Sequence, residues 1–377
     1  MITINSSPKG IDFALNHPAF KITSNSSPVK LVGRIFIRES WSAGSYTQLP
    51  DIYLDPDSNG SAIFPIGKIL REYFETIEIA IFSITSIMRD EYSLKNYYVR
   101  FYEWDGSTLS NLQTSNTLRL LFGKLFYQDW PGHDFRTNQL ETDLEYLSNI
   151  GDKIRTWTTA KHYLYWFNHL SGTNNIELRV KLYYTDKTTE DQTIDTYSNG
   201  VEYEVLIVPA GYMQLNLATF GSGKTIYRYD FGLYKSDDTQ VAKTISFYIE
   251  NKPWWGKQFL FRNNYGVLEA VNAAGKEDDE QKVDIETSRK RLQYDYAATD
   301  FEYIQKVKSR TKEFNCNIGP LTKTEAQHLG EILNDKLFKI GDTKLIPCNI
   351  LSKSIKPYNE GEDLQVIELN YQYAFEV

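Results

Sequence analysis

Cysteine is almost absent from this sequence, which excludes several kinds of site. The 377 residues include only Cys316 and Cys348, and neither belongs to a C-x-x-C pair. No further cysteine exists to complete a thiolate zinc site, so we expect no bound zinc of that kind. The two cysteines are expected to be reduced and buried, with a single disulfide between them as the alternative.

Long apolar runs and an excess of positive charge are lacking as well. No run of about 18 apolar residues occurs, so we expect no membrane insertion. Residues 1–7 contain neither a basic stretch nor an apolar one, which argues against a signal peptide. The net charge is −8, so no nucleic-acid partner is expected. These absences together predict a protein made and assembled in a cytoplasm without an export signal.

Aromatic residues, by contrast, are abundant. The sequence contains 27 tyrosines, 20 phenylalanines and 7 tryptophans but only 3 methionines, a composition that suits β structure better than helical bundles. A chain of 377 residues is long enough for two or three domains. The expected fold class is therefore mainly β, with tandem β-sandwich domains and a C-terminal α+β domain that carries one capped helix.

The first β domain is expected over residues 1–160. Residues 1–27 contain prolines, glycine and small polar residues, which predicts an extended arm with a short edge strand, with a flexible terminus as the alternative. Residues 29–38 alternate as a strand. Residues 128–160 are polar and irregular, which predicts a long loop or insertion that closes the domain, with a short helix near residues 140–147 as an option.

A β-sandwich is expected over residues 161–272. Residues 176–182 are apolar at every even position, the pattern of a half-buried strand. Phe259 and Phe261 share one face of a further strand, which we expect to close this sandwich. The charged, apolar-free residues 275–282 then predict a linker or an exposed hairpin.

The C-terminal α+β domain is expected over residues 280–377. Strands are predicted at residues 301–308 and 313–318. Thr322 and Glu325 have the spacing of a capping box, in which each residue satisfies a free backbone N–H at the start of a helix. The regular alternation at the end of the chain predicts a strand that is tied into a sheet.

No catalytic site or cofactor site is predicted. Residues 218–225 are close to a phosphate-binding loop, but Ala218 replaces its first glycine and a strand pattern follows where a helix is required. The spacing of His162 and His169 fits neither a helical nor a strand metal site. Residues 55–60 lack the glutamate of a calcium loop. We expect no enzyme, no metal and no cofactor; a glycan hydrolase is the enzymatic alternative, because sequence does not show whether two carboxylates face each other across a cleft.

An aromatic pair stands out within residues 253–266. Trp254 and Trp255 point to opposite sides of an extended chain, so at most one is easily buried in the same core. The pair is interpreted as part of a core strand with a partly exposed tryptophan, or else as an anchor for a partner protein or a glycan. Their place near the charged break favours a contact between domains or subunits over a sugar platform. The residues predicted at an interface are Trp254, Trp255, Tyr265, Trp130 and Trp157.

Several segments of the C-terminal half resemble a class of viral proteins. They are residues 205–212 (Val-Leu-Ile-Val-Pro-Ala-Gly-Tyr), 258–266 (Gln-Phe-Leu-Phe-Arg-Asn-Asn-Tyr-Gly), 310–312, 321–326 and 369–376. Over about residues 160–377 their order resembles that of structural tail proteins, of the hub, ring or baseplate type, from tailed bacteriophages and prophages of Bacteroidota-type hosts. The resemblance implies β-rich modules, repeated copies in rings and no enzymatic activity.

Two hypotheses for the function follow. The first is a non-enzymatic virion structural protein of the phage tail, which binds other copies of itself and other tail proteins as a symmetric oligomer. The alternative is a carbohydrate-binding or host-adhesion module that uses exposed aromatic side chains to bind a host glycan.

Overall fold

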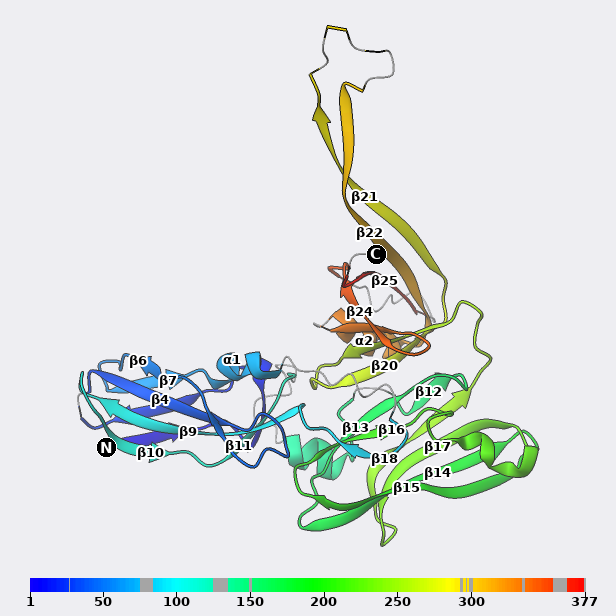
Figure 1. Ribbon diagram of the computed structural model, residues 1–377. Helices are drawn as coiled ribbons and strands as arrows, with labels where there is room; N and C mark the ends of the chain where they lie inside the picture. Colours follow the sequence, from blue (N-terminus) through cyan, green and yellow to red (C-terminus); the bar gives the residue numbers. More distant parts are fainter. Residues whose placement is uncertain are drawn as a thin grey trace. The chain divides into compact units, whose positions relative to one another are not determined.

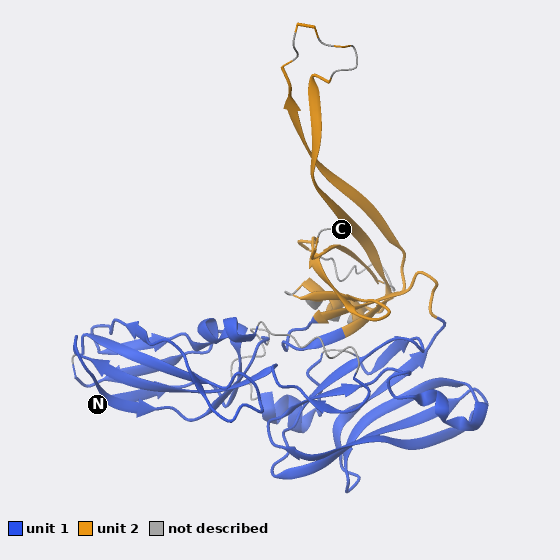
Figure 2. Ribbon diagram, viewed as in Figure 1, with its two compact units in different colours: residues 1–251, 262–269 blue, residues 252–261, 270–377 orange. Residues whose placement is uncertain are grey.

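The protein folds into two units that are mainly β. The computed structural model describes residues 1–26, 28–74, 84–124, 135–148, 151–291, 294–295, 297, 301–333, 336–354 and 365–375. Its several separate sheets are consistent with multiple β-sandwich domains. Unit 1 comprises Met1–Asn251 and Arg262–Glu269, and unit 2 comprises Lys252–Phe261 and Ala270–Val377 (Figure 2).

The N-terminal part of unit 1 is built from two sheets (Figure 1). One has the order β1-β3-β7 and the other β2-β11-β9-β4-β5, with β10 paired to β9 and β6 paired to β4. The bounds are β1 Ile2–Ser6, β2 Ile11–Phe13, β3 Phe20–Ser24, β4 Lys30–Ile37, β5 Thr47–Gln48, β6 Ile52–Leu54, β7 Ser61–Phe64, β9 Leu94–Trp104, β10 Leu109–Thr114 and β11 Leu118–Leu121. Short helices are η1 Ala14–Asn16, α1 Ile66–Leu70 and η2 Arg71–Phe74.

The segment predicted as an extended arm is part of this fold instead, and the short edge strand expected within it is β1, at the edge of the sheet β1-β3-β7. β1 and β3 pair antiparallel, and Phe20 and Ile22 are fully buried in the core together with Leu31 of β4. The prolines and polar residues between the strands suggested an arm, but the apolar positions of β1 and β3 are what bury the segment. Burial of such side chains outweighs the turn-forming composition around them.

The remainder of unit 1 contains a second pair of sheets. Their orders are β12-β18-β17-β14-β15 and β13-β16-β8. The bounds are β8 Met88–Arg89, β12 Lys153–Thr156, β13 Tyr163–Phe167, β14 Thr173–Tyr184, β15 Thr189–Val201, β16 Val205–Pro209, β17 Ile226–Lys235 and β18 Gln240–Ile249, with short helices η4 Arg136–Thr142, η5 Leu217–Thr219 and η6 Gly221–Gly223. Trp166 of β13 and Phe231 of β17 are buried in one core, which therefore lies between the two sheets.

The sequence pattern of β14 is confirmed, whereas the expected closing loop is only partly correct. The even positions Ile176, Leu178, Val180 and Leu182 are all buried. Within residues 128–160, the segments 128–134 and 149–150 lie outside the described residues. The rest is not simply a loop, because it contains η4 and also β12, which pairs parallel with β18 as a full member of the sheet.

Unit 2 is built around one seven-stranded sheet with the order β20-β19-β23-β24-β25-β22-β21. The bounds are β19 Lys257–Arg262, β20 Leu268–Ala273, β21 Glu277–Arg289, β22 Tyr303–Leu321, β23 Leu337–Ile340, β24 Leu345–Ile350 and β25 Gln365–Tyr373, with helices α2 Lys323–Leu329 and η7 Gly330–Leu333. Ala326 and Leu329 of α2 pack into the core of this sheet. Thr322 N donates to Glu325 Oε2 at 2.6 Å and Glu325 N donates to Thr322 Oγ1 at 3.3 Å, so the predicted capping box is confirmed.

One strand prediction in this region is wrong, and two predicted strands prove to be parts of one. Phe259 and Phe261 do not close the middle sandwich, because β19 pairs with β23 and both phenylalanines lie in the core of unit 2. Alternation in a strand indicates which face is buried, but it does not identify the sheet that the strand joins. The strands expected at residues 301–308 and 313–318 are a single strand, β22. The exposed hairpin, rather than the linker, is the correct interpretation of residues 275–282.

Candidate assembly interface

The most exposed described feature of unit 2 is the long hairpin of β21 and β22 (Figure 1). β22 pairs with β25 only from Glu313 to Leu321, whereas its register with β21 runs up to Tyr303. Among the described residues, the stretch from Tyr303 to Lys312 therefore has β21 as its only strand partner. We call residues 277–289 and 303–312 the hairpin arm, because both of its outer strand edges are open.

One face of the hairpin arm carries exposed apolar side chains among polar ones, since Arg310 pairs with Val283 on that face. Residues that pair directly across two antiparallel strands share a face, and successive odd positions of β21 stay on that face. Val283 and Ile285 of β21 lie on the same face of the arm as Val307 and Tyr303 of β22, and all four side chains are exposed. Further down, the same face carries Phe314, which lies in the core of unit 2. The exposed apolar stripe is thus a continuation of the buried face of the sheet.

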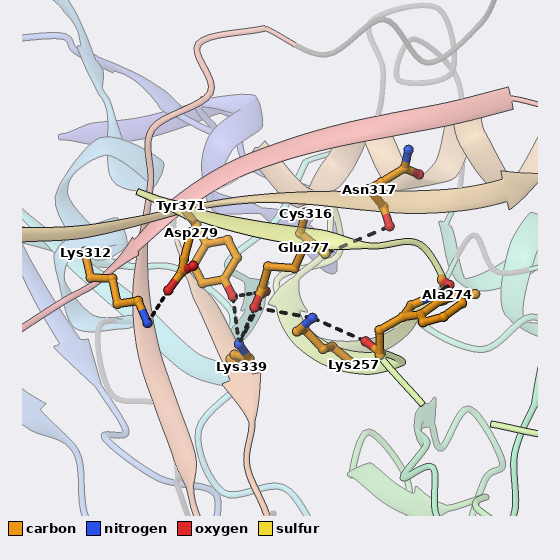
Figure 3. A network of polar contacts seen from close by, with 10 residues as sticks. Lys257, Ala274, Glu277, Asp279, Lys312, Cys316, Asn317, Lys339 and Tyr371 are labelled. Atoms are coloured by element: carbon orange, nitrogen blue, oxygen red, sulfur yellow. Dashed lines mark hydrogen bonds and ion pairs between the residues drawn. The ribbon is translucent and has the colours of Figure 1, made fainter. Parts of the chain in front are cut away.

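A polar network anchors the arm at its base (Figure 3). Glu277, the first residue of β21, forms ion pairs with Lys257 at 3.3 Å and with Lys339 at 3.2 Å. Tyr371 donates its hydroxyl to Glu277 at 2.5 Å, and Lys339 Nζ lies 3.0 Å from the same hydroxyl. One carboxylate therefore joins β21 to β19, β23 and β25, and each partner is held by charge-assisted hydrogen bonds.

The titratable groups around this network are structural and not reactive. Burial, together with the hydrogen bond to Glu277, raises the pKa of Tyr371 far above its usual range. Burial also raises the pKa of Cys316 and that of Cys348 to about 11. Both cysteines are free and buried, so the reduced state is the one observed and the disulfide alternative is not. Thiols with such pKa values are poor nucleophiles at neutral pH.

The predicted tryptophan pair lies in unit 2, next to the arm in sequence. Trp254 is 89% exposed, whereas Trp255 is 39% exposed and donates its ring N–H to the Ala274 carbonyl at 2.7 Å. Lys276 places its ammonium 5.9 Å from the Trp255 ring. Trp255 is thus partly engaged within its own unit, while Trp254 is presented to solvent.

The other predicted interface residues are not exposed together with this pair. Tyr265 is buried in unit 1, where its ring lies 6.2 Å from that of Phe13 and 6.0 Å from that of Phe135. Trp157 is buried in unit 1 as well. Neither side chain is available to a partner, which corrects those two predictions. Trp130 lies outside the described residues.

The sequence prediction missed the residues of the arm itself. Residues 275–282 were recognised as charged, but Val283, Ile285 and Val307 were not linked to them. The signal that could have found them is the match between two neighbouring segments of opposite charge, each with sparse β-branched residues at alternate positions. Such segments are typical of paired exposed strands.

The histidines and the loop near Gly221 form no candidate site. His162 is buried and its Nε2 lies 2.9 Å from Thr156 Oγ1; burial lowers its pKa to about 4. Residues 218–225, which are close in sequence to a phosphate-binding loop, overlap η5 and contain η6, and they lead into the strand β17 instead of a helix. Among the residues that the structure describes, no group of three or more His, Cys, Asp or Glu side chains could hold a metal ion. Likewise, no helix in the described segments is long and apolar enough to cross a membrane.

A second candidate surface is a groove on the five-stranded sheet of unit 1. It has a volume of about 570 Å³ and lies over β14, β15 and β17. Tyr234 offers an aromatic ring there, with the Arg179 guanidinium 5.0 Å from its centroid. Gln192 and Asp191 add hydrogen-bonding groups to the lining. An aromatic ring beside several polar groups suits a hydroxyl-rich ligand.

Comparison with known proteins gives little further guidance. No family model matches this chain, and no curated protein matches it. It is similar to the solved structure of CBD12 from CALX1.2 at 7% identity and a TM-score of 0.17, over 62% of this chain and 79% of that one. It is also similar to dimeric latent PorU from Porphyromonas gingivalis at 11% identity and a TM-score of 0.20, over 83% of this chain and 31% of that one. TM-scores this low carry no argument about function.

Proposed function

We propose that this protein is a non-enzymatic structural subunit of a phage tail, of the hub, ring or baseplate type, that assembles as a symmetric homo-oligomer. The observation that carries the proposal is the hairpin arm, a long pair of strands with two open edges and an exposed apolar stripe. Natural monomeric proteins cover, shorten or bend such edges, since an open edge pairs readily with another chain. An arm of this length is therefore suited to contact between subunits.

The way the arm is held supports the same proposal. Glu277, the first residue of β21, forms ion pairs with Lys257 and Lys339 and accepts a hydrogen bond from Tyr371. These three contacts fix the position of the base of the arm in the sheet. A rigid arm loses less conformational entropy on binding than a flexible one, which favours defined assembly geometry. Among the described residues, no metal-ligand cluster competes with this structural role.

The proposal is tested by locating the protein and counting its copies. Purified protein is examined by size-exclusion chromatography with light scattering, and tailed particles that carry the gene are examined by electron cryomicroscopy and mass spectrometry. We expect a closed assembly of fixed copy number in solution and density for that assembly in the tail. A protein that stays monomeric at high concentration and is absent from particles would sink the proposal.

A truncated arm supplies the matched control. Lys282 and Thr311 are paired across the two strands, so a two-residue Asn-Gly turn can join them and remove the outer arm. The Glu277 network lies below the cut and is retained. We expect a folded unit 2 that no longer self-associates. An unchanged copy number would show that the arm does not form the contact between subunits.

The alternative function, glycan binding by a host-adhesion module, is favoured by the groove over β14, β15 and β17. A glycan array tests it with two variant sets. Arg179→Ala and Tyr234→Ala remove groups that line the groove, and Trp254→Ala and Trp255→Ala remove the exposed aromatic pair. Binding that is lost with one set and kept with the other would locate the sugar site, whereas no binding by the unmodified protein would count against this alternative.

A further inference from the structure

The two strands of the hairpin arm carry opposite charges. β21, Glu277–Arg289, contains six carboxylates and two cationic side chains, a net charge of −4. Residues 303–312 of β22 contain four cationic side chains and no carboxylate, a net charge of +4. The two long edges of the arm therefore differ in the sign of their net charge.

Ion pairs inside the hairpin use only some of these charges. Lys312 pairs with Asp279, and Lys308 lies 3.8 Å from Glu286. Among the described residues, the side chains that have no ion-pair partner are Asp278, Glu280 and Asp284 on β21, and Lys306 and Arg310 on β22. An unpaired acidic set and an unpaired basic set thus remain on the two strands of one hairpin.

The outer backbone edges of the arm are open as well. β21 is the last strand of the seven-stranded sheet, and residues 303–312 extend beyond the pairing with β25. Ten residues of strand present about 30 Å of unpaired N–H and C=O groups. Both requirements for adding a neighbouring strand, an open ladder and an exposed side-chain surface, are therefore met on both sides.

We propose that copies of this chain join head to tail through the arm, with the acidic β21 of one copy beside the basic β22 of the next. This inference rests on the proposed oligomeric function and names the surface that would produce the oligomer. β21 and β22 run in opposite directions within one hairpin. Neighbouring arms that point the same way therefore bring β21 and β22 together antiparallel. Because the two joining surfaces differ, the contact repeats from copy to copy, and it closes into a ring where its rotation completes a full turn.

The charge pattern favours a second copy of this chain over another occupant. A second copy necessarily presents the complementary edge, since both edges belong to the same hairpin. If the charges served only to keep open edges apart, one sign on both strands would do this better, because opposite edges attract. A two-fold contact of β21 with β21, or of β22 with β22, would juxtapose like charges and is disfavoured.

Charge and apolar surface have different roles in this contact. Exposed ion pairs contribute little affinity each, but they select the partner edge and its register. Val283, Ile285, Val307 and Tyr303 share one face, so neighbouring arms would bring these apolar side chains together in a belt that Arg310 interrupts. Burial of that belt and new backbone hydrogen bonds would supply the stability of the ring.

The experiment is a charge swap in the full-length chain. The first variant combines Asp278→Lys, Glu280→Lys and Asp284→Lys, so that both of its edges are basic. The second combines Lys306→Glu and Arg310→Glu, so that the side chains without an ion-pair partner are acidic on both of its strands. We expect each variant alone to self-associate at least about tenfold more weakly than the unmodified chain. We expect an equimolar mixture to recover assembly, with the two variants alternating and an even copy number by native mass spectrometry.

Each outcome decides the inference. Variants that assemble as well as the unmodified chain would overturn it, while an oligomeric unmodified chain would leave the proposed function standing. Loss of assembly that mixing does not restore would also overturn it, because the neighbour's opposite strand would then not be the partner. A variant that fails to fold cannot recover in the mixture, so recovery itself excludes misfolding as the cause.

A matched control addresses the change in net charge. Glu72→Lys, Asp143→Lys and Glu250→Lys reverse three exposed carboxylates outside the arm and change the net charge as much as the first variant does. This control is expected to assemble normally. If it loses assembly to the same extent, net charge rather than the arm controls association and the inference is wrong.

Discussion

Tyr371 donates a 2.5 Å hydrogen bond to Glu277 Oε2, and so links β25 to the first residue of the hairpin arm. The Tyr371 ring also stacks on Phe314 of β22, with the ring centroids 4.9 Å apart. A single side chain therefore contacts both strands of the hairpin at its base. This arrangement makes the stability of unit 2 and the position of the arm depend on the same few residues.

Replacing Glu277 with alanine is expected to destabilise unit 2 strongly. The change leaves the ammonium groups of Lys339 and Lys257 without their carboxylate, and their side chains are only 15% and 21% exposed. Loss of one partner from such a buried pair costs about 2–4 kcal/mol. Chemical unfolding measures the change, and hydrogen exchange of β25 gives a local readout. Asp278→Ala, at the exposed neighbouring residue, is the control and should stay within about 0.5 kcal/mol.

Tyr371→Phe should have a smaller effect in the same measurement. The variant keeps the ring stacked on Phe314 and removes only the hydroxyl, so we expect a loss of about 1–2 kcal/mol. An effect as large as that of Glu277→Ala would mean that the hydroxyl, and not the carboxylate, is the centre of the network.

A glycine that faces the core gives a further prediction. A Cβ at Gly33 would lie 2.4 Å from Cε1 of the fully buried Phe64. Gly33→Ala therefore forces the ring to move within a packed core, which costs about 1–3 kcal/mol. Gly44→Ala, where no atom lies within 4 Å of the new Cβ, is the matched control. Equal unfolding free energies for the two variants would show that the core adapts without cost.

These examples show what local sequence patterns determine in this fold. The alternation over residues 29–38 correctly predicted the strand β4, and the Thr322–Glu325 spacing correctly marked the start of α2. Both patterns depend on residues close together in the chain. Side-chain periodicity and helix capping act over a few residues, so a single sequence contains the whole signal.

The pairing between strands that are distant in the sequence was not predicted correctly. Phe259 has the same alternating pattern in either sheet, and nothing local states that β19 lies beside β23 instead of a strand of the middle sandwich. The burial of Tyr265 has the same cause, because its partner Phe13 is far away in sequence. Register and sheet membership arise from packing between residues that are distant in the sequence. The local alternation of apolar residues does not encode that packing.

Substitution of the two tryptophans is expected to separate an effect on the free energy of unfolding from an effect on self-association. Trp254 is almost fully exposed, so Trp254→Ala should leave the free energy of unfolding within about 0.5 kcal/mol of the unmodified value. Trp255→Ala should cost about 1–2 kcal/mol, because it removes the hydrogen bond to Ala274. If Trp254 is a subunit contact, its loss weakens self-association measured by light scattering. Unchanged association would remove Trp254 from the interface.

The last prediction concerns the pH dependence of unit 1 and centres on His162. Burial lowers the pKa of this histidine to about 4, below its usual value of 6.5. The unfolded chain therefore binds a proton before the folded chain does, and stability falls as the pH drops from about 6.5 towards 4. Between pH 7 and pH 5 this single site should remove about 2 kcal/mol.

Asp12 makes a comparison between variants necessary. Burial raises the pKa of its carboxyl to about 6, above its usual 3.8, so the folded state takes up a proton first and gains stability over part of the same range. The two sites oppose each other, and the pH profile of the unmodified protein is not diagnostic. The measurement is therefore the difference in unfolding free energy between the unmodified protein and His162→Gln, with the exposed His17→Gln as control. The His162 difference should fall by about 2 kcal/mol from pH 7 to pH 5, because only the unmodified chain has a buried imidazole that resists protonation. A difference that is constant with pH would show that the imidazole is protonated in place without breaking the core around Thr156.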